Sequence, residues 1–121
     1  YTDCKDELDV MDTLGYKIQR MDEYVKAEDY YETARLVQSC DLVISVCTSL
    51  IHLSGALGVP CWIMVPKHPA WRYQNEGGNP WYRSVRQYRQ PENKQDGWIP
   101  VVQRIAMDLD DLVSARRKRV A

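Results

Sequence analysis

The sequence contains no phenylalanine, only two histidines, and four cysteines of which no two have the CxxC spacing typical of zinc and redox motifs. With so few ligands available, we expect no metal site. Cys47 and Cys61 each border an apolar run, which favours buried, reduced thiols over disulfides. The cysteines therefore predict a cytoplasmic protein without structural disulfides.

Long apolar segments are also missing. The longest runs, Leu42–Val46 and Cys61–Pro66, are far too short to cross a bilayer, so no membrane span is expected. The acidic start Tyr1–Val10 lacks the apolar stretch of a signal peptide. A chain of 121 residues that is 45% apolar and 27% charged has the length and composition of one globular domain, which we place over residues 1–121.

Neither sign of charge is in large excess, since the formal net charge is −1, and this excludes a generally basic nucleic-acid binder. The charge is nevertheless uneven. Residues 1–32 hold ten acids and four bases, whereas residues 67–104 hold three acids and seven bases. The basic middle either pairs with the acidic start or faces an anionic ligand. The basic tail, residues 114–121, is typical of a solvated terminus or linker.

One segment has a clear α/β pattern. Two apolar runs, Leu42–Val46 and Cys61–Val65, are typical of buried parallel strands, and the helical stretch Thr48–Leu57 between them ends at Gly58 and Pro60. This order predicts a right-handed βαβ unit. We therefore expect an α/β fold, a Rossmann-like parallel sheet with flanking helices.

Other elements follow from weaker patterns. A helix is expected over Ala27–Ser39, with Tyr30, Ala34 and Val37 on one stripe, and short strands over Tyr16–Met21 and Ser84–Tyr88. The first thirteen residues carry little pattern. The long connection 66–82 has the length of a functional or mobile loop. Asp96 is the expected N-cap of a last helix, whose core-facing residues we expect to be Trp98, Val101, Val102, Ile105, Leu109 and Leu112.

A candidate anion site lies where the first predicted strand meets the next helix. At helical spacing, Leu50, Leu53 and Leu57 form the expected buried seam. Thr48 and His52 lie on the opposite side, with Gly55 beside them. Backbone N–H groups, a hydroxyl and an imidazole at a helix N-terminus are what a phosphate or pyrophosphate needs. In the competing interpretation, Thr48 is only an N-cap and His52 is a partly buried histidine bonded to a neighbouring carbonyl.

The stretch DLVISVCTSLIHLSGALGVPCWIMVP, Asp41–Pro66, resembles a signature of the heptosyltransferase-like glycosyltransferases of family 9 and of the glycosyltransferase-like region that follows tetratricopeptide repeats in bacterial proteins. Those proteins typically read D-L-V-I-S-V-D-T-x-x-x-H-L-A-G-A-L-G-x-P-x-W-x-x-L-P. The resemblance continues through Trp71–Tyr73, Pro80–Arg86 and Arg89–Pro91 and covers about residues 27–113.

This resemblance implies a GT-B architecture of two Rossmann-like domains, of which the present chain is most of the C-terminal, nucleotide-sugar-binding one. Thr48, Ser49 and His52 match the loop that holds the donor phosphates. Lys67, His68 and Arg72 are further candidates for neutralising the leaving pyrophosphate, although each also fits a solvated loop charge. The implied reaction needs no metal or cofactor, and its catalytic base is not among the residues that the resemblance identifies.

Two departures from the family pattern qualify this expectation. Cys47 stands where family members usually have an aspartate implicated in donor binding. The chain is also too short for a GT-B enzyme, so we expect a missing N-terminal acceptor domain, an isolated chain that is inactive, and exposed apolar surface that favours self-association. The alternative is a non-catalytic binding or scaffold module that kept the fold and lost the chemistry.

A third possibility, nucleic-acid binding, rests on three arginines among aromatic residues. Arg83, Arg86 and Arg89 alternate with Trp81, Tyr82 and Tyr88. In a strand, Arg86 projects to one face while Arg83 and Arg89 project to the other, so no continuous basic stripe results. We therefore expect no nucleic-acid partner.

Overall fold

The computed structural model describes residues 4–25, 28–92 and 97–120. It divides into two compact units, residues 1–33 and 34–121. The predicted N-cap Asp96 lies outside the described residues.

The first unit contains helix α1 (Lys5–Thr13) and the short 3-10 helix η1 (Asp22–Tyr24). Asp6 and Glu7 lie in the first turn of α1, where carboxylates are favoured by the helix dipole. The sequence analysis missed α1, which buries none of its side chains and so lacks a strong apolar stripe.

The strand expected over Tyr16–Met21 is wrong. Residues 16–20 have no regular structure, and Met21 precedes η1. The side chains of Tyr16 and Ile18 are 62% and 54% exposed. Weak alternation of apolar residues does not make a strand when no neighbouring strand supplies a hydrogen-bonding partner.

Helix α2 spans Tyr30–Ser39, shorter at its start than the predicted Ala27–Ser39, and Ala27 itself lies outside the described residues. The carboxylate of Asp29 accepts a hydrogen bond from the N–H of Tyr31 at 3.0 Å, which is the geometry of an N-cap. Of the predicted stripe, Val37 is buried, but Tyr30 is largely exposed.

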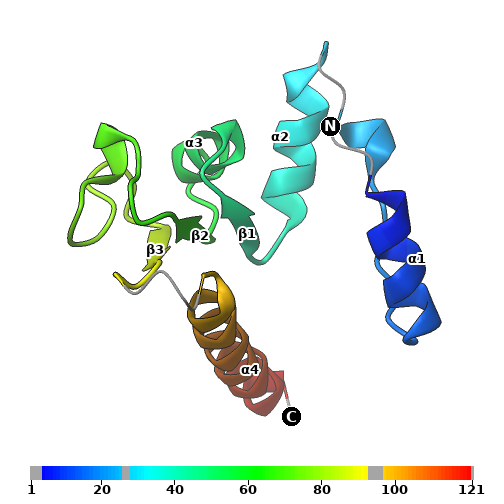
Figure 1. Cartoon of the computed structure of the whole chain (residues 1–121). Coiled ribbons are helices and arrows are strands. Elements are labelled where there is room, and N and C mark those ends of the chain that lie inside the picture. The colour runs from blue at the N-terminus through cyan, green and yellow to red at the C-terminus, as the bar shows by residue number, and fades with distance from the viewer. Residues whose placement is uncertain (1–3, 26–27, 93–96, 121) are drawn as a thin grey trace. The chain divides into compact units, whose positions relative to one another are not determined.

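The second unit is built on a three-stranded sheet in the order β1-β2-β3 (Figure 1). The strands are β1 (Val43–Val46), β2 (Cys61–Val65) and β3 (Val85–Arg89), and both pairings are parallel. The predicted α/β class, the βαβ unit and the last short strand are thereby confirmed. Because all three strands point the same way, their carboxyl ends meet at one edge of the sheet.

Helix α3 (Ser49–Ala56) covers one face of this sheet. It ends as predicted: Gly58 has a φ of +71°, and its N–H and that of Val59 bond to the carbonyls of Gly55 and Ser54 at 3.1 and 2.9 Å, a Schellman motif. The expected leucine seam needs correction. Ile51 and Ser54 are the fully buried residues of α3, and Leu50, Leu53 and Leu57 flank them, partly buried against the core. The seam is rotated because α3 lies against β2 as well as β1.

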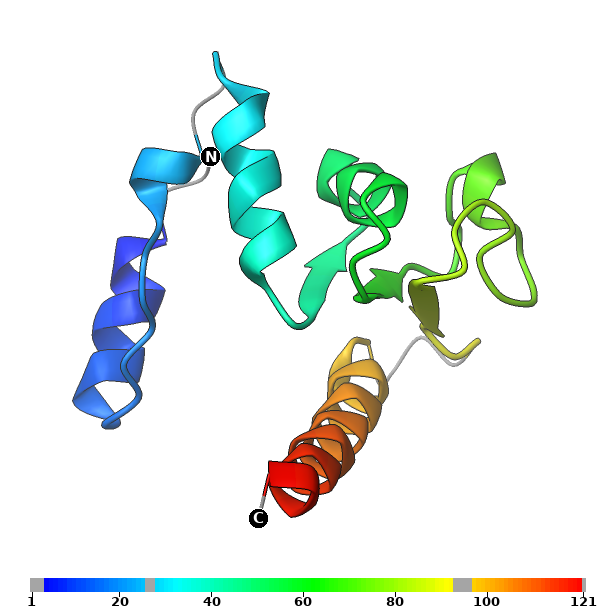
Figure 2. The same ribbon diagram turned by 180° about the vertical axis from the view of Figure 1, so that it is seen from behind.

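The opposite face of the sheet carries Ile44, Val46, Trp62, Met64, Arg86 and Tyr88, and the long helix α4 (Ile99–Val120) packs over its β3 side (Figure 2). Val101 and Ile105 of α4 are buried with Tyr88, and Trp62 and Met64 pack against them. Ile44 and Val46 are 40% and 47% exposed. The strand Leu42–Val46 is therefore not buried on both faces as predicted, because α4 crosses the sheet at β3 rather than at β1.

The predicted core face of the last helix is also too wide. Trp98, Val102 and Leu112 are 38%, 52% and 43% exposed, so only Val101 and Ile105 of the six residues are buried. A helix that meets the sheet mainly at one strand buries few of its side chains, however apolar its sequence is.

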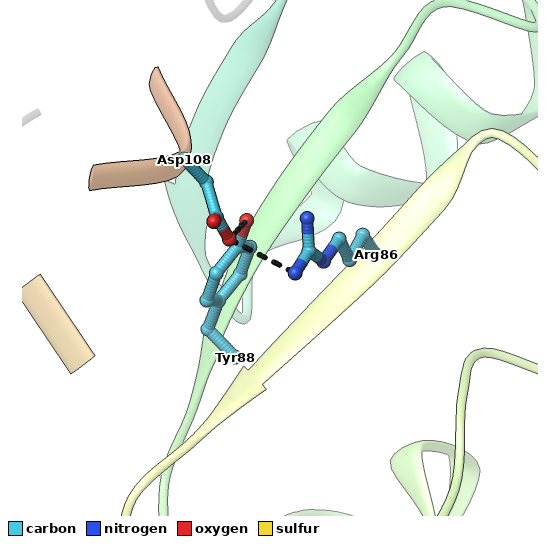
Figure 3. A network of polar contacts seen from close by, with 3 residues as sticks. All are labelled: Arg86, Tyr88 and Asp108. Atoms are coloured by element: carbon cyan, nitrogen blue, oxygen red, sulfur yellow. Dashed lines mark hydrogen bonds and ion pairs between the residues drawn. The ribbon is translucent and has the colours of Figure 1, made fainter. Parts of the chain in front are cut away.

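A polar network fastens α4 to β3 (Figure 3). Asp108 accepts a hydrogen bond from the hydroxyl of Tyr88 at 2.7 Å, and the same carboxylate oxygen pairs with Arg86 at 2.9 Å. The guanidinium of Arg86 also lies over the Tyr88 ring, 4.7 Å from its centroid. Since Tyr88 is fully buried, this network fixes the position of α4 along β3.

The basic tail continues α4 to Val120, with exposed side chains. One of its arginines, Arg116, pairs with Asp41 at 2.8 Å, and a surface pair of this kind contributes little stability. In the described part of the chain, no helix is both long and apolar enough to cross a membrane.

Candidate functional site

The turn from β1 into α3 places Thr48 and Ser49 at the carboxyl end of the sheet, as predicted. Thr48 is the N-cap of α3, with extended backbone angles, but its side chain makes no capping hydrogen bond. Its hydroxyl lies 3.4 Å from that of Ser45. Both Thr48 and Ser49 are exposed. The Thr48 side chain therefore leaves the first N–H groups of α3 uncapped, while the Thr48 carbonyl accepts a hydrogen bond from the N–H of Ile51 at 3.2 Å.

His52 lies one turn into α3 and is held by two tyrosines. Its Nδ1 is 3.3 Å from the hydroxyl of Tyr82, and the two rings meet edge to face with centroids 5.9 Å apart. The ring of Tyr73 lies on another side, with its centroid 6.5 Å away. The competing interpretation of His52 as a carbonyl-bonded histidine is thus replaced: its partner is a phenol from the 66–84 connection.

Gly55 makes this contact possible. A Cβ atom placed on Gly55 would lie 2.3 Å from Cγ of Tyr82, closer than any side chain permits. Gly55 lies on the same side of α3 as His52, as the helical spacing predicts. The absence of a side chain therefore lets Tyr82 lie flat on the helix and reach His52.

We expect Gly55→Ala to destabilise the second unit by about 2 kcal/mol. Alanine gains about 1 kcal/mol in helix propensity, but moving the base of the Tyr82 ring costs about 3 kcal/mol in strain. Urea unfolding followed by circular dichroism measures the net change. A variant as stable as the parent would contradict the close approach.

Gly78 provides the matched control. A Cβ atom there has nothing within 4 Å, and its φ is not positive. Gly78→Ala should leave stability within about 0.5 kcal/mol of the parent.

Cys47, which precedes Thr48, lies half-buried with its thiol directed at the carbonyl of Met64, 3.6 Å away. Burial raises the pKa of this thiol, and a hydrogen bond from Tyr73 with the positive charges of Arg72 and Arg89 only partly opposes the effect. Burial likewise raises the pKa of Tyr73. The position therefore holds a neutral thiol near two arginines.

Arg89 organises the connection around these groups. Its guanidinium donates hydrogen bonds to the carbonyls of Tyr73, Gln74 and Gly77, with the Gln74 bond at 2.8 Å. Gln74 has a φ of +56°, a conformation that is strained for a residue with a side chain. Arg89 thus holds a strained turn in place by donating hydrogen bonds to its carbonyls.

The three basic loop candidates are not brought to one place. Lys67 and His68 line a polar pocket of about 330 Å³ with Arg89, and the Lys67 ammonium donates to the carbonyl of Glu92 at 3.0 Å. Arg72 is exposed, with its guanidinium 5.6 Å from the centroid of Tyr73. Thr48, Ser49 and His52 do not line that pocket. Arg86 and Arg89 project to opposite faces of the sheet, which confirms the prediction that β3 carries no basic stripe.

Within the described ranges, no group of three or more histidine, cysteine, aspartate or glutamate side chains could hold a metal ion. The four cysteines are free thiols.

The sequence analysis missed Tyr73, Tyr82 and Arg89 as parts of the site. Tyr82 is separated from His52 by 30 positions, so helical or strand periodicity cannot connect them. One usable signal was the pairing of Trp71–Tyr73 with Trp81–Tyr82, two aromatic clusters that flank the same loop.

Comparison with known proteins gives one distant relationship. The chain is 31% identical over 117 residues to protein FlbA of Caulobacter vibrioides. The match covers 95% of this chain but only 19% of FlbA, so the chain spans about a fifth of that relative's length. No known family profile matches the sequence, and no solved structure matches it significantly.

Proposed function

We propose that this chain is the donor-binding part of a glycosyltransferase, and that its sheet belongs to the C-terminal Rossmann-like domain of a GT-B architecture. One observation carries the proposal. The residues that match the family's donor-phosphate loop, Thr48, Ser49 and His52, lie at the carboxyl end of a parallel strand and in the first turn of the following helix. Open α/β sheets bind ligands at this edge.

In the proposed reaction, this site stabilises the negative charge of the leaving diphosphate. The N–H groups at the start of α3 and the Thr48 hydroxyl would donate to the phosphate oxygens of a nucleotide-diphosphate sugar. His52, fixed by Tyr82, would add a further donor from the same face of the helix. The acceptor and the catalytic base would come from a separate N-terminal domain, and the reaction would use no metal or cofactor.

The alternative is a non-catalytic binding or scaffold module, and Cys47 is the observation that favours it. An aspartate at this position would carry a negative charge beside Arg72 and Arg89, whereas the thiol, whose ordinary pKa of 9.0 is raised further by burial, is neutral. The charge pattern of the family's donor site is therefore altered at one of its positions. Retention of Thr48 and His52 favours the enzyme. The free thiols fit a cytoplasmic protein, which we propose for the whole protein.

We expect ADP, UDP or GDP to bind the chain saturably, with amide chemical-shift changes centred on residues 48–52. Thr48→Val and His52→Ala should each weaken binding about tenfold, the effect of losing one hydrogen bond to a charged group. Titration monitored by two-dimensional NMR measures both the site and the affinity.

Thr13→Val is the matched control, because Thr13 is an exposed threonine at the end of α1 in the other unit. It should not change the affinity. If none of the three nucleotides binds a folded sample, or if both variants bind like the parent, the donor site is refuted.

A further inference from the structure

Two tryptophans stand exposed on the connection between β2 and β3. The side chains of Trp71 and Trp81 are 77% and 58% exposed. Their rings lie close together, with centroids 6.3 Å apart and planes at 86°, so they form the two walls of an open corner. Indole rings are large apolar surfaces, and a pair left in water at this exposure calls for an explanation.

The corner is rigidly supported from beneath. The indole N–H of Trp81 donates to the carbonyl of Arg72 at 3.0 Å, which ties one wall to the backbone beside the other. The side chain of Asn79 accepts from the N–H groups of Trp81 and Tyr82, at 2.9 and 3.0 Å. Because the Trp81 side chain is held in advance, this wall loses less entropy when it binds a ligand.

The tyrosines next to the two tryptophans point the other way. Tyr73, two residues after Trp71, is 2% exposed, and Tyr82 packs on Gly55 and His52. In each of the two aromatic clusters, therefore, the tyrosine packs against the protein and the tryptophan is exposed to solvent. The tyrosines anchor the loop and Trp81 adds one bond to the Arg72 carbonyl, while both indoles remain largely exposed.

The size of the corner limits what it can bind. Two tryptophans offer about 300–500 Å² of surface, whereas a stable protein interface buries about 800 Å² on each partner. Ala70 and Pro80, next to the two tryptophans in sequence, add a small exposed apolar area, whereas Arg72, Gln74, Asn75 and Glu76 are exposed and polar. The ligand is therefore small, with apolar faces and polar edges.

The angle between the two indole rings distinguishes between two ligands of this kind, a nucleobase and a pyranose ring. A nucleobase is flat and is best held between parallel rings, which walls at 86° cannot provide. A pyranose ring presents C–H groups on its face and at its edge and hydroxyls around its rim. It can stack on one indole and touch the other with its edge, while its hydroxyls bond to water and to exposed polar side chains such as Arg72.

We propose that Trp71 and Trp81 form a carbohydrate-binding surface that takes one pyranose ring of a glycan. The assignment does not depend on the nucleotide site, because it uses a different set of side chains. It adds a glycan-recognition element to a chain for which we propose nucleotide-sugar binding.

Titration with maltohexaose, chitohexaose and mannohexaose tests the proposal, with the indole N–H resonances of the four tryptophans as the readout. At least one of these glycans should shift the Trp71 and Trp81 signals saturably. Trp71→Ala should weaken that binding at least tenfold, and Trp71→Tyr, which keeps an aromatic wall, should weaken it less. Trp71→Ala is the decisive variant because Trp81 also anchors the Arg72 carbonyl.

Trp98→Ala is the control, since Trp98 lies next to α4 and not on this loop. It should bind like the parent, as should Thr48→Val, which disables only the proposed phosphate site. Three outcomes of the titrations overturn the proposal: no glycan shifts the two indoles, the shifts persist in Trp71→Ala, or uridine and adenosine shift them in place of glycans. A parent chain that dimerises in sedimentation, while Trp71→Ala stays monomeric, would place a second copy on the corner and also overturn it.

Discussion

Replacing Arg89 with methionine should destabilise the second unit by about 3–4 kcal/mol, the largest effect we expect from one substitution outside the apolar core. Hydrogen bonds from a charged donor contribute about 1.5–3 kcal/mol each when buried, and Arg89 donates to three loop carbonyls. Because the bonds to Gln74 and Gly77 are exposed, water replaces part of what is lost, and the expected total is below the sum of three buried bonds. Methionine keeps the aliphatic volume but removes all of these donors. Urea unfolding gives the loss of free energy, and amide exchange in residues 73–77 should rise with it.

The strain at Gln74 provides a second readout of the same contact. Gln74→Gly should stabilise the parent by about 1 kcal/mol, because glycine adopts the positive φ without strain. Arg83→Met is the matched control, since Arg83 is an exposed arginine just before β3. Equal losses in Arg83→Met and Arg89→Met would show that charge, and not the bonds to the loop, is responsible.

The second large effect concerns Tyr88 at alkaline pH. Burial, and then the hydrogen bond to Asp108, raises the pKa of Tyr88 from 10.0 to about 12, while Arg86 partly opposes the shift. In the unfolded chain the phenol ionises near pH 10, whereas in the folded state it stays protonated until about pH 12. Between these values the unfolded state binds fewer protons, so raising the pH favours unfolding.

We therefore expect the stability that Tyr88 contributes to be complete below pH 10 and to fall by about 3 kcal/mol as the pH passes 12. Tyr73, Cys47 and Cys61 also have raised pKa values and act in the same direction. Denaturant unfolding at a series of pH values measures the slope. Tyr88→Phe should be less stable at neutral pH, through loss of the bond to Asp108, and should show a shallower alkaline decline.

Tyr16→Phe controls for the loss of a hydroxyl group, because the Tyr16 side chain is 62% exposed. It should follow the parent at every pH. An alkaline slope in Tyr88→Phe as steep as that of the parent would mean that Tyr88 ionises freely in the folded state.

The sequence predicts the centre of this fold well because the information there is local. The apolar runs of β1 and β2, and the Gly58 stop of α3, each lie within a few residues of the element that they define. The exposure of Ile44 and Val46 could not be predicted in this way, because it depends on where α4 crosses the sheet. Helix α1 was missed for the related reason that it buries nothing.

The same difference between local and long-range information applies to the candidate site. The positions of Thr48 and His52 at a strand end and on one helix face follow from spacing, and the structure confirms them. Their surroundings do not follow, because Tyr73, Tyr82 and Arg89 approach from a connection that has no periodicity. Cys47 illustrates the difference: its identity is plain in the sequence, but its partial burial and its approach to Arg72 and Arg89 depend on the fold.

The parallel order of the strands has a consequence for how the second unit folds. Neither strand pair can form as a hairpin, since residues 47–60 separate β1 from β2 and residues 66–84 separate β2 from β3. Chain entropy must be lost over each connection before the ladder bonds that it closes can form, which makes such sheets slow to fold. The second connection is the longer one, and it closes fully only when Arg89, the last residue of β3, reaches the carbonyls of Tyr73, Gln74 and Gly77. The loop that carries the aromatic groups of the candidate site is therefore completed by the strand that follows it.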